Sequence, residues 1–353
     1  MHVPDGFIDA PVSVAAGAVA AAAVAVSLRG ARRELGDVAG SPRLGSERTA
    51  PLAGLVAAFI FAVQMLNFPV AAGTSGHLLG GALAAILVGP YTGVLCVSVV
   101  LLMQGILFAD GGLTALGVNI TTMGVVTVVV SYAVFTLLVK VLPKGRRSVT
   151  AAAFVGALVS VPASAAFFTL LYAIGGTTDV PIGKVLTAMV GVHVLIGIGE
   201  AAITALTVGA VIAVRPDLVH GARGLTTGLK LRVGGELVDA PAAAPAPVAA
   251  RSTRKVWAAG LVTTLVLAGF VSYYASASPD GLEKVAADQG IDRKVEEHAA
   301  AGSPLADYGV KDVSDARLSG GLAGVIGVGT TVAFGTGVFW VVRRRRTAQA
   351  PVV

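Results

Sequence analysis

Long apolar runs separated by short polar segments dominate the chain. Most runs approach the length of about 20 residues that an α-helix needs to cross a bilayer, and none alternates like a transmembrane β-barrel. The pattern predicts an all-α integral membrane protein with a seven-helix bundle followed by a two-helix unit. The expected spans are residues 12–28, 51–69, 78–89, 92–108, 117–139, 149–174, 185–213, 256–276 and 320–342.

Two of these runs need separate interpretation. Residues 78–89 are short for a bilayer and stop at Gly89-Pro90, which is tolerated where protein surrounds the segment. Residues 12–28 could be mistaken for a signal peptide, but no basic residue precedes them and arginines follow. We therefore expect a first span with its N-terminus outside the membrane.

Composition supports a membrane protein and its orientation. Apolar residues make up 55% of the chain and charged residues 13%, with a mean hydropathy of +0.82, far from soluble domains. The net charge of +6 comes from clustered Lys and Arg, which the positive-inside rule explains without a nucleic-acid partner. We expect a multi-pass protein of the bacterial cytoplasmic membrane, surrounded by lipid, with its C-terminus in the cytoplasm.

A change of composition divides the chain. Residues 215–255 are basic and then run into an Ala/Pro-rich stretch that favours extended conformations, so they are predicted to be a cytoplasmic linker. The expected units are a membrane domain over 1–214, this linker, a two-span domain over 256–342 with 277–318 outside, and a cytoplasmic tail over 343–353. Cys96 is the only cysteine, so no disulfide or thiolate cluster is expected.

Candidate metal chemistry lies at the N-terminus. The Met1 amine, the His2 backbone nitrogen and the His2 imidazole can close adjacent chelate rings on one ion, and His77 follows a predicted span on the same side of the membrane. Four nitrogens in a plane suit Ni(II) or Cu(II), whereas Zn(II) prefers a tetrahedron. The turn signature Pro4-Asp5-Gly6 predicts that the terminus folds back. The alternative is a disordered start with no metal role.

Several longer motifs resemble the CbiM/NikM family, the membrane substrate-binding components of energy-coupling-factor (ECF) transporters for cobalt and nickel. Pro279-Asp280-Gly281-Leu282-Glu283 is similar to the PDGLE segment of the small NikN-type partner, here fused into one chain. The motifs that carry the resemblance are Met1 to Phe7, Gln64 to Val70, Gly73 to Gly81 and His193 to Glu200.

This resemblance implies a ligand set and partners. It implies that the ion is held by the Met1 amine, the His2 backbone nitrogen and imidazole, and His77. The implied partners are a transmembrane coupling (T) subunit and cytoplasmic ATPase subunits of the ECF complex. In agreement, the chain has no Gly-x-x-x-x-Gly-Lys-Ser/Thr phosphate loop of its own.

Other polar residues near these motifs are candidates for supporting roles. Residues close to His77 could fix its tautomer or anchor the terminus, or only cap helix ends; they are Gln64, Asn67, Thr74 and Ser75. His193 and Glu200 are seven residues apart and share one face of a span, where ionisable groups are functional candidates by default. We expect them to have a structural role or to contact the coupling subunit rather than to bind metal.

The leading function is capture of Ni(II) or Co(II) outside the membrane by the substrate-specific component of an ATP-driven ECF transporter. The ion is then the transported substrate, and the chain needs no cofactor and is not an enzyme. Nickel is favoured by the planar nitrogens and by the nickel-type tail. The alternatives are cobalt transport for cobalamin biosynthesis, ATP-independent secondary transport, and a membrane metalloenzyme, which would require an open coordination position.

Overall fold

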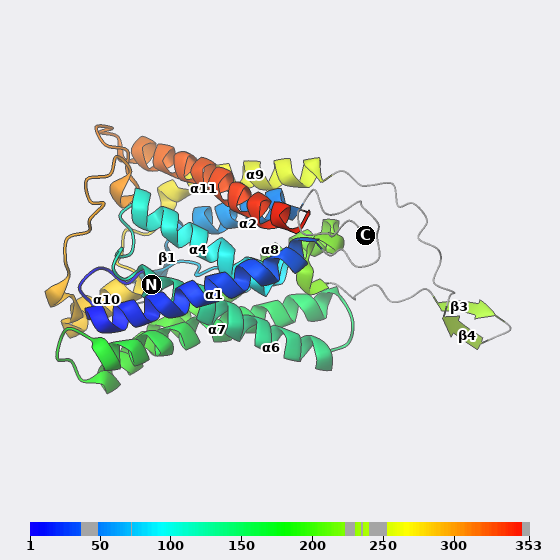
Figure 1. Ribbon diagram of the computed structural model, residues 1–353, viewed down its shortest axis with the longest axis horizontal. Coiled ribbons are helices and arrows are strands. Elements are labelled where there is room, and N and C mark those ends of the chain that lie inside the picture. The colour runs from blue at the N-terminus through cyan, green and yellow to red at the C-terminus, as the bar shows by residue number, and fades with distance from the viewer. Residues whose placement is uncertain (37–48, 72, 223–229, 234–235, 240–252, 348–353) are drawn as a thin grey trace.

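The computed structural model describes residues 1–36, 49–71, 73–222, 230–233, 236–239 and 253–347. Its helices lie roughly along one axis (Figure 1). The helices of eight or more residues are α1 (Ala10–Gly36), α2 (Thr49–Gln64), α3 (Gly81–Val88), α4 (Pro90–Leu107), α6 (Thr127–Val141), α7 (Arg146–Gly175), α8 (Ile182–Val214), α9 (Arg254–Gly269), α10 (Gly281–Gln289) and α11 (Ala316–Thr347).

Short helical turns complete the described part of the chain. One turn, α5 (Leu116–Asn119), continues through the π-helix η2 (Ile120–Val126) into α6, so that Leu116–Val141 forms one span. The remaining turns are η3 (Pro216–Leu218), η4 (His220–Ala222), η5 (Val271–Tyr274), η6 (Ile291–Lys294) and η7 (Ala306–Tyr308).

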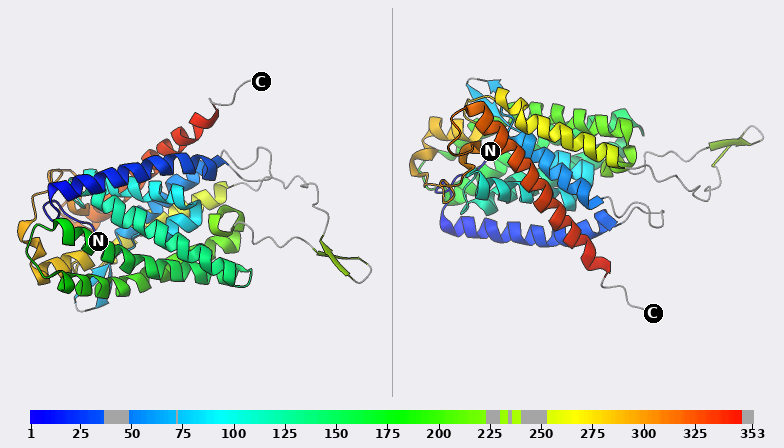
Figure 2. Two further views of the ribbon diagram at one scale, coloured as in Figure 1. Left: turned by 60° about the horizontal axis from the view of Figure 1, so that its bottom comes forward. Right: turned by 90° about the horizontal axis from the view of Figure 1, so that it is seen from above.

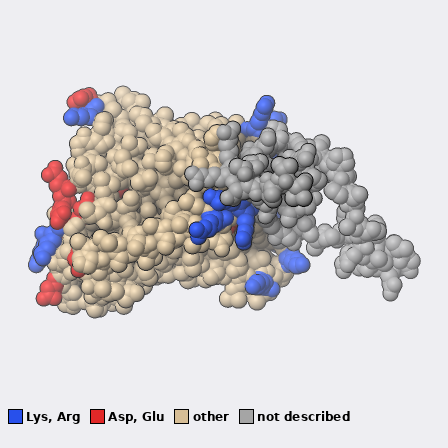
Figure 3. All heavy atoms as spheres, viewed as in Figure 1, with Lys and Arg blue, Asp and Glu red and all other residues tan. Residues whose placement is uncertain are grey.

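The predicted helical membrane architecture is confirmed. Among the described residues, seven helices are long and apolar enough to cross a bilayer, and α2 is a shorter apolar helix. On the face seen in Figure 3, the charged side chains of the described residues gather towards the two ends and leave an almost uncharged surface between them. We call the end that holds Met1, α10 and the loops around them the Met1 end (Figure 1).

One predicted span has a different structure. Residues 78–89 were expected to be a helix, but the helix begins only at Gly81, because Gly80 has a φ of 90°, which is left-handed backbone. An eight-residue helix is about 12 Å long at 1.5 Å per residue, far less than the ~30 Å hydrocarbon core. Residues 77–80 form neither helix nor strand and are buried, so protein encloses this irregular backbone as membrane depth requires.

The prediction of helix up to residue 69 is also wrong. Helix α2 ends at Gln64, and β1 (Phe68–Ala71) pairs antiparallel with β2 (Thr74–Gly76). Pro69 cannot continue a helix and is accommodated in this short strand, opposite Ser75. The hairpin delivers the chain directly to His77.

The C-terminal unit packs along α2. Helices α9 and α11 both contact α2 and each other (Figure 2). The approach to α11 is close because glycines line it: a Cβ at Gly327 would lie 2.2 Å from the Phe61 ring, and one at Gly54 would lie 2.3 Å from the Thr336 hydroxyl. The segment between α9 and α11, including α10, covers the Met1 end.

Parts of the predicted linker and tail are described. Strands β3 (Lys230–Val233) and β4 (Glu236–Asp239) form an antiparallel hairpin inside the predicted linker. The Ala/Pro-rich stretch of the linker lies outside the described residues. Helix α11 extends to Thr347, past the predicted end of the span at residue 342, and the remainder of the tail is not described.

Candidate metal centre

The N-terminal segment is buried and is hydrogen-bonded to α5 and to the loop before it. Met1 is 2% exposed and Val3 0% exposed. The Val3 backbone N–H donates to Asn119 Oδ1 at 2.8 Å, and Asn119 Nδ2 donates to the Val3 carbonyl at 3.0 Å. The Asp5 carboxylate accepts the Thr114 backbone N–H at 2.8 Å. The expectation that the terminus folds back is therefore confirmed.

The Met1 amine lies between an imidazole and a carboxylate. Its nitrogen is 2.7 Å from His77 Nε2 and 2.6 Å from Asp280 Oδ2. The Met1 side chain continues inward, where the Ser164 hydroxyl donates to its sulfur at 3.7 Å. Three segments far apart in the sequence thus converge on one buried amine.

His77 presents one defined nitrogen to this amine. Its Nδ1–H donates to the Leu78 carbonyl at 3.0 Å, so the lone pair is on Nε2. The irregular backbone of 77–80 places the ring beside Met1, and His77 is 5% exposed. A neutral imidazole with a fixed tautomer is the form in which histidine binds metals.

The His2 ring stacks on the His77 ring, with centroids 5.1 Å apart and planes inclined by 14°. Its Nε2 lies 3.2 Å from Gln104 Oε1 and its Nδ1 lies 3.1 Å from Asp110 Oδ1. Burial lowers the pKa of the His2 imidazole to about 4 against the opposing effect of the Asp110 carboxylate, so the ring is neutral at neutral pH.

A neutral His2 ring has only one N–H for the two oxygens that face it. With that proton on Nε2, the N–H donates to Gln104, and Nδ1 presents a lone pair towards Asp110. A cation bound at Nδ1 would remove the repulsion between this lone pair and the Asp110 carboxylate. Nδ1 is also the ring nitrogen that can close a chelate ring with the His2 backbone nitrogen, so the favourable tautomer is the one that chelation requires.

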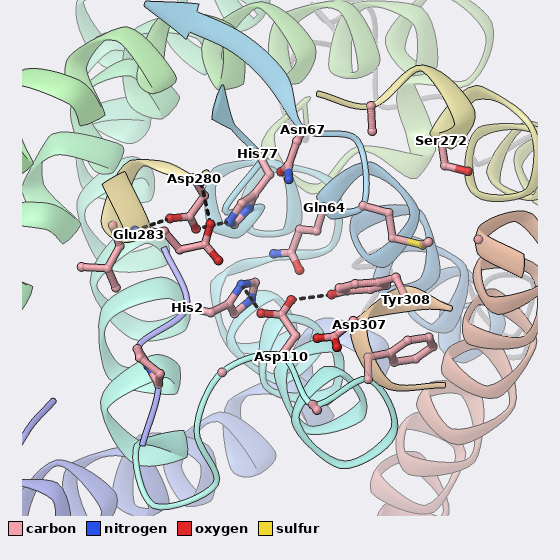
Figure 4. A pocket seen from close by; sticks show the side chains of 18 of the residues that line it. His2, Gln64, Asn67, His77, Asp110, Ser272, Asp280, Glu283, Asp307 and Tyr308 are labelled. Atoms are coloured by element: carbon pink, nitrogen blue, oxygen red, sulfur yellow. Dashed lines mark hydrogen bonds and ion pairs between the residues drawn. The ribbon is translucent and has the colours of Figure 1, made fainter. Parts of the chain in front are cut away.

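Gln104, Tyr308 and Asp110 form a hydrogen-bonded chain beside His2. Figure 4 shows the part of this chain from Tyr308 through Asp110 to His2. Gln104 Nε2 donates to the Tyr308 hydroxyl at 3.0 Å, and that hydroxyl donates to Asp110 Oδ2 at 2.5 Å. Burial, together with the Asp110 carboxylate, raises the pKa of Tyr308 well above its usual range, so the phenol remains a donor.

Asp280 comes from the C-terminal unit. It caps the N-terminus of α10, where its Oδ1 accepts the Glu283 backbone N–H at 2.8 Å and the Glu283 side chain accepts the Asp280 N–H at 2.9 Å. Its other oxygen faces Met1 and lies 3.5 Å from His77 Nε2. Although burial alone would raise it, the Met1 ammonium and His77 hold the pKa of the Asp280 carboxyl well below its usual range.

Two buried side chains hold the irregular backbone after His77. Glu200 Oε2 accepts the Leu79 N–H at 2.7 Å and Oε1 accepts the Gly80 N–H at 3.1 Å. Gln64 Nε2 donates to the Leu79 carbonyl at 2.9 Å. These bonds replace the helical hydrogen bonds that the break removes, since buried backbone groups must be paired.

The other predicted residues lie around this centre in different roles. The Ser75 hydroxyl donates to the Ser278 carbonyl at 2.7 Å and so ties β2 to the C-terminal unit. Thr74 is buried in β2. The backbone carbonyl of Asn67 accepts the Ser276 N–H at 2.7 Å. His193 bonds through Nδ1 to the Met189 carbonyl at 2.8 Å, whereas Glu200 bonds to the 79–80 backbone.

The site contains residues that sequence reasoning missed, namely Gln104, Asp110, Asp280 and Tyr308. Asp280 had a usable signal, because Asp-Gly-Leu-Glu is a capping-box sequence in a segment expected on the same side as Met1. Gln104 is a polar residue inside an apolar run. Within the described residues, no group of three or more His, Cys, Asp and Glu side chains is placed to hold a metal ion, so metal binding here would require main-chain nitrogens as well.

Comparisons with known families identify both units of the chain. Residues 2–218 match the family model for the cobalt uptake substrate-specific transmembrane region, and residues 254–344 match the PDGLE domain.

Individual relatives are named as transporters. A putative fused nickel transport protein NikMN from Archaeoglobus fulgidus is 37% identical over 220 residues, which are 62% of this chain and 68% of that protein. A cobalt transport protein CbiM from Sorangium cellulosum is 34% identical over 177 residues, or 48% of this chain and 76% of that protein. A crystal structure of a transition metal transporter aligns with a TM-score of 0.50 at 26% identity, over 61% of this chain and 93% of that chain.

Proposed function

Because the chain belongs to the family of cobalt uptake substrate-specific transmembrane regions, we propose that it captures Ni(II) at its N-terminus as the substrate-binding component of an ATP-driven ECF importer. Co(II) is the second substrate. The chain is a metal transport component with a fused PDGLE domain. Met1, His2 and His77 are the proposed ligands, and the metal is cargo.

One observation carries the proposal: the buried Met1 amine lies 2.7 Å from His77 Nε2, with the His2 ring stacked on His77. An amine and an imidazole this close both have lone pairs that one ion can share once the amine loses its proton. The His2 backbone nitrogen and Nδ1 are joined to the amine by the chain itself. Modest movements of these groups around an ion would give a planar set of four nitrogens.

The charges around the centre suit a divalent ion. A deprotonated backbone nitrogen cancels one of the two charges of the ion, and Asp280 and Asp110 lie beside the donors to compensate the rest. Gln104 would keep the His2 proton on Nε2, and the Leu78 carbonyl would keep the His77 proton on Nδ1. A planar nitrogen set favours Ni(II) over Co(II) on geometric grounds.

ATP hydrolysis is assigned to partner subunits. The sequence has no phosphate-binding loop, so a T subunit and cytoplasmic ATPases would supply the driving force. ATP-independent secondary transport is the competing mechanism, and dependence of uptake on the co-expressed ATPases separates the two.

The direct test is metal binding with and without one additional glycine before Met1. The extension moves the free amine out of the chelate, so Ni(II) affinity should fall by at least about 100-fold in competition titrations with a chelator of known affinity. His193→Ala is the control, because His193 is a buried histidine that bonds within α8. The Ni(II) affinity of this variant should stay near that of the native protein. Equal affinities for the native and extended proteins would exclude the N-terminal centre.

A further inference from the structure

A cavity of about 610 Å³ opens beside the proposed ligands and is far larger than a bare ion. Six water molecules occupy about 180 Å³ at their share of liquid volume, about 30 Å³ each. The cavity therefore accommodates an ion with its complete first shell of water. His2 and His77 line one part of it, and Gln64, Asp110 and Asp307 are among the residues that line other parts (Figure 4).

The lining is acidic. It includes four carboxylate residues, Asp110, Asp280, Glu283 and Asp307, and one arginine, Arg317. A concave surface of one charge sign raises the local concentration of ions of the opposite charge. Asp307 is exposed, which places its charge where an ion arrives from solution.

Gln64 supplies an independent indication of the ligand. The residue is 4% exposed and lines the cavity, with its side chain among those facing it (Figure 4). Only an N–H can donate to the Leu79 carbonyl, so the atom bonded there is Nε2 and the other terminal atom of the side chain is the oxygen Oε1. This Oε1 has no hydrogen-bond partner among the described residues. A buried acceptor of this kind is suited to a ligand that presents hydrogen-bond donors.

The backbone that places the acidic wall is strained. Ala109, Asp307 and Tyr308 have φ angles of 55°, 54° and 56°, a left-handed conformation that is uncommon for residues other than glycine. The segment around Asp307 is joined to the segment around Ala109 by the Asp307 N–H, which donates to the Phe108 carbonyl at 2.9 Å. Such conformations persist where surrounding structure enforces them and cluster at functional sites.

The wall is not arranged to coordinate an ion directly. In the part of the chain that the structure describes, no three acidic, histidine or cysteine side chains converge as metal ligands. Carboxylates and a buried amide oxygen around a space of this volume can instead accept hydrogen bonds from metal-bound water, which is a strong donor because the ion polarises it.

We propose that this cavity is a loading chamber, in which the hydrated divalent cation is held through its water ligands by Asp307, Gln64 and their neighbours before the nitrogen donors displace the water. This inference rests on the proposed function, since it describes how the ion reaches the same centre. The chamber lies between the two units, because Asp307 comes from the C-terminal unit and Gln64 from α2.

The test measures the rate of Ni(II) association with the full-length protein by stopped-flow mixing, following formation of the nitrogen-bound complex. Asp307→Asn keeps a residue that tolerates left-handed backbone and removes only the charge. Its association rate constant should fall roughly 3- to 10-fold at low ionic strength, with the dissociation rate unchanged and with the loss shrinking as salt is added.

Asp312→Asn is the matched control, since Asp312 also has positive φ, at 65°, and does not line the cavity. Gln64→Met should slow association as well, and Co(II) should show the same fold-change as Ni(II), because water-mediated contacts recognise charge and hydration. Equal association rates for the two Asp variants, or an effect on dissociation alone, would overturn the chamber. Native binding that is insensitive to the added glycine would instead overturn the proposed centre.

Discussion

At the scale of single residues, the proposed metal centre uses two main-chain nitrogen atoms in addition to side chains. The Met1 amine and the His2 backbone nitrogen belong to the main chain, and only His2 and His77 contribute imidazoles. Each ring has an oxygen acceptor for its proton, so the tautomer of each imidazole is set before an ion arrives. Substitutions at these positions should change affinity more than stability.

His77→Ala should lower Ni(II) affinity by at least about 100-fold, more than the 10- to 100-fold typical of residues that only support a ligand. The fold should survive, because Glu200 and Gln64 still hold the backbone after residue 77. Isothermal titration with a thermal-unfolding measurement on the same sample checks both statements. A variant with unchanged affinity would remove His77 from the ligand set.

Asp280→Asn should loosen the contact of the C-terminal unit with the terminus. The substitution leaves the Met1 ammonium without its anionic partner, and breaking a buried ion pair from one side is strongly unfavourable. Hydrogen exchange in the metal-free protein should become faster over 276–290. Asp288→Asn is the matched control, because it removes only an ion pair with Lys284 at the exposed side of the same helix. Equal exchange in both variants would contradict the role of Asp280.

At the scale of elements, the irregular segment 77–80 before α3 is the decisive feature. Its buried N–H groups are accepted by Glu200, a residue 120 positions away from Gly80. Glu34 does the same at the opposite end of the bundle, where it accepts the Tyr91 N–H at 3.1 Å and the Thr92 N–H at 2.7 Å. The contacts of Glu200 and Glu34 are therefore chemically similar, but only that of Glu200 lies next to the proposed metal centre.

Glu200→Gln should reduce metal affinity by about 10- to 100-fold, because one of the two backbone donors then faces an amide N–H and the backbone that carries His77 shifts. Glu34→Gln should lower thermal stability without this loss of affinity. Affinity and unfolding temperature measured for both variants decide the point. If both variants bind Ni(II) equally well, Glu200 is structural only.

Elements and centre were predictable to different degrees. Long apolar runs sufficed to place most spans, because the thickness of the bilayer sets the number of consecutive apolar residues that a spanning helix needs. The break at Gly80 was not foreseen, since it requires Glu200 as a tertiary partner. Met1, His2 and His77 could be grouped through chelate chemistry and family resemblance, whereas Asp280 and Tyr308 arrive through packing of the C-terminal unit.

At the scale of the whole molecule, two units share one buried boundary. Small residues let α11 approach α2 closely, and the segment between α9 and α11 contributes Asp280 and Tyr308 to the Met1 end. Residues 1–222 and 253–353 expressed as separate chains should therefore co-purify from the membrane. Failure to co-purify would show that the covalent link is needed to hold the units together.

In that two-chain system, Gly327→Leu should abolish co-purification, because a Cβ there would lie 2.2 Å from the Phe61 ring. Gly329→Leu on the same helix should leave it intact, since nothing lies within 4 Å of the added atom. Affinity capture followed by quantitative blotting measures both. Equal retention of the two variants would mean that α2 and α11 do not form the boundary.

The contact between Met1 and Asp280 spans 279 positions in the chain, and this separation has a consequence for biosynthesis. Translation at about 5–20 residues per second makes Asp280 available on the order of 14 to 60 s after Met1. The Met1 amine therefore has no ion-pair partner at Asp280 during this time. During that interval the amine is accessible to acetylation or to removal of Met1, and either change would prevent the proposed chelate from forming.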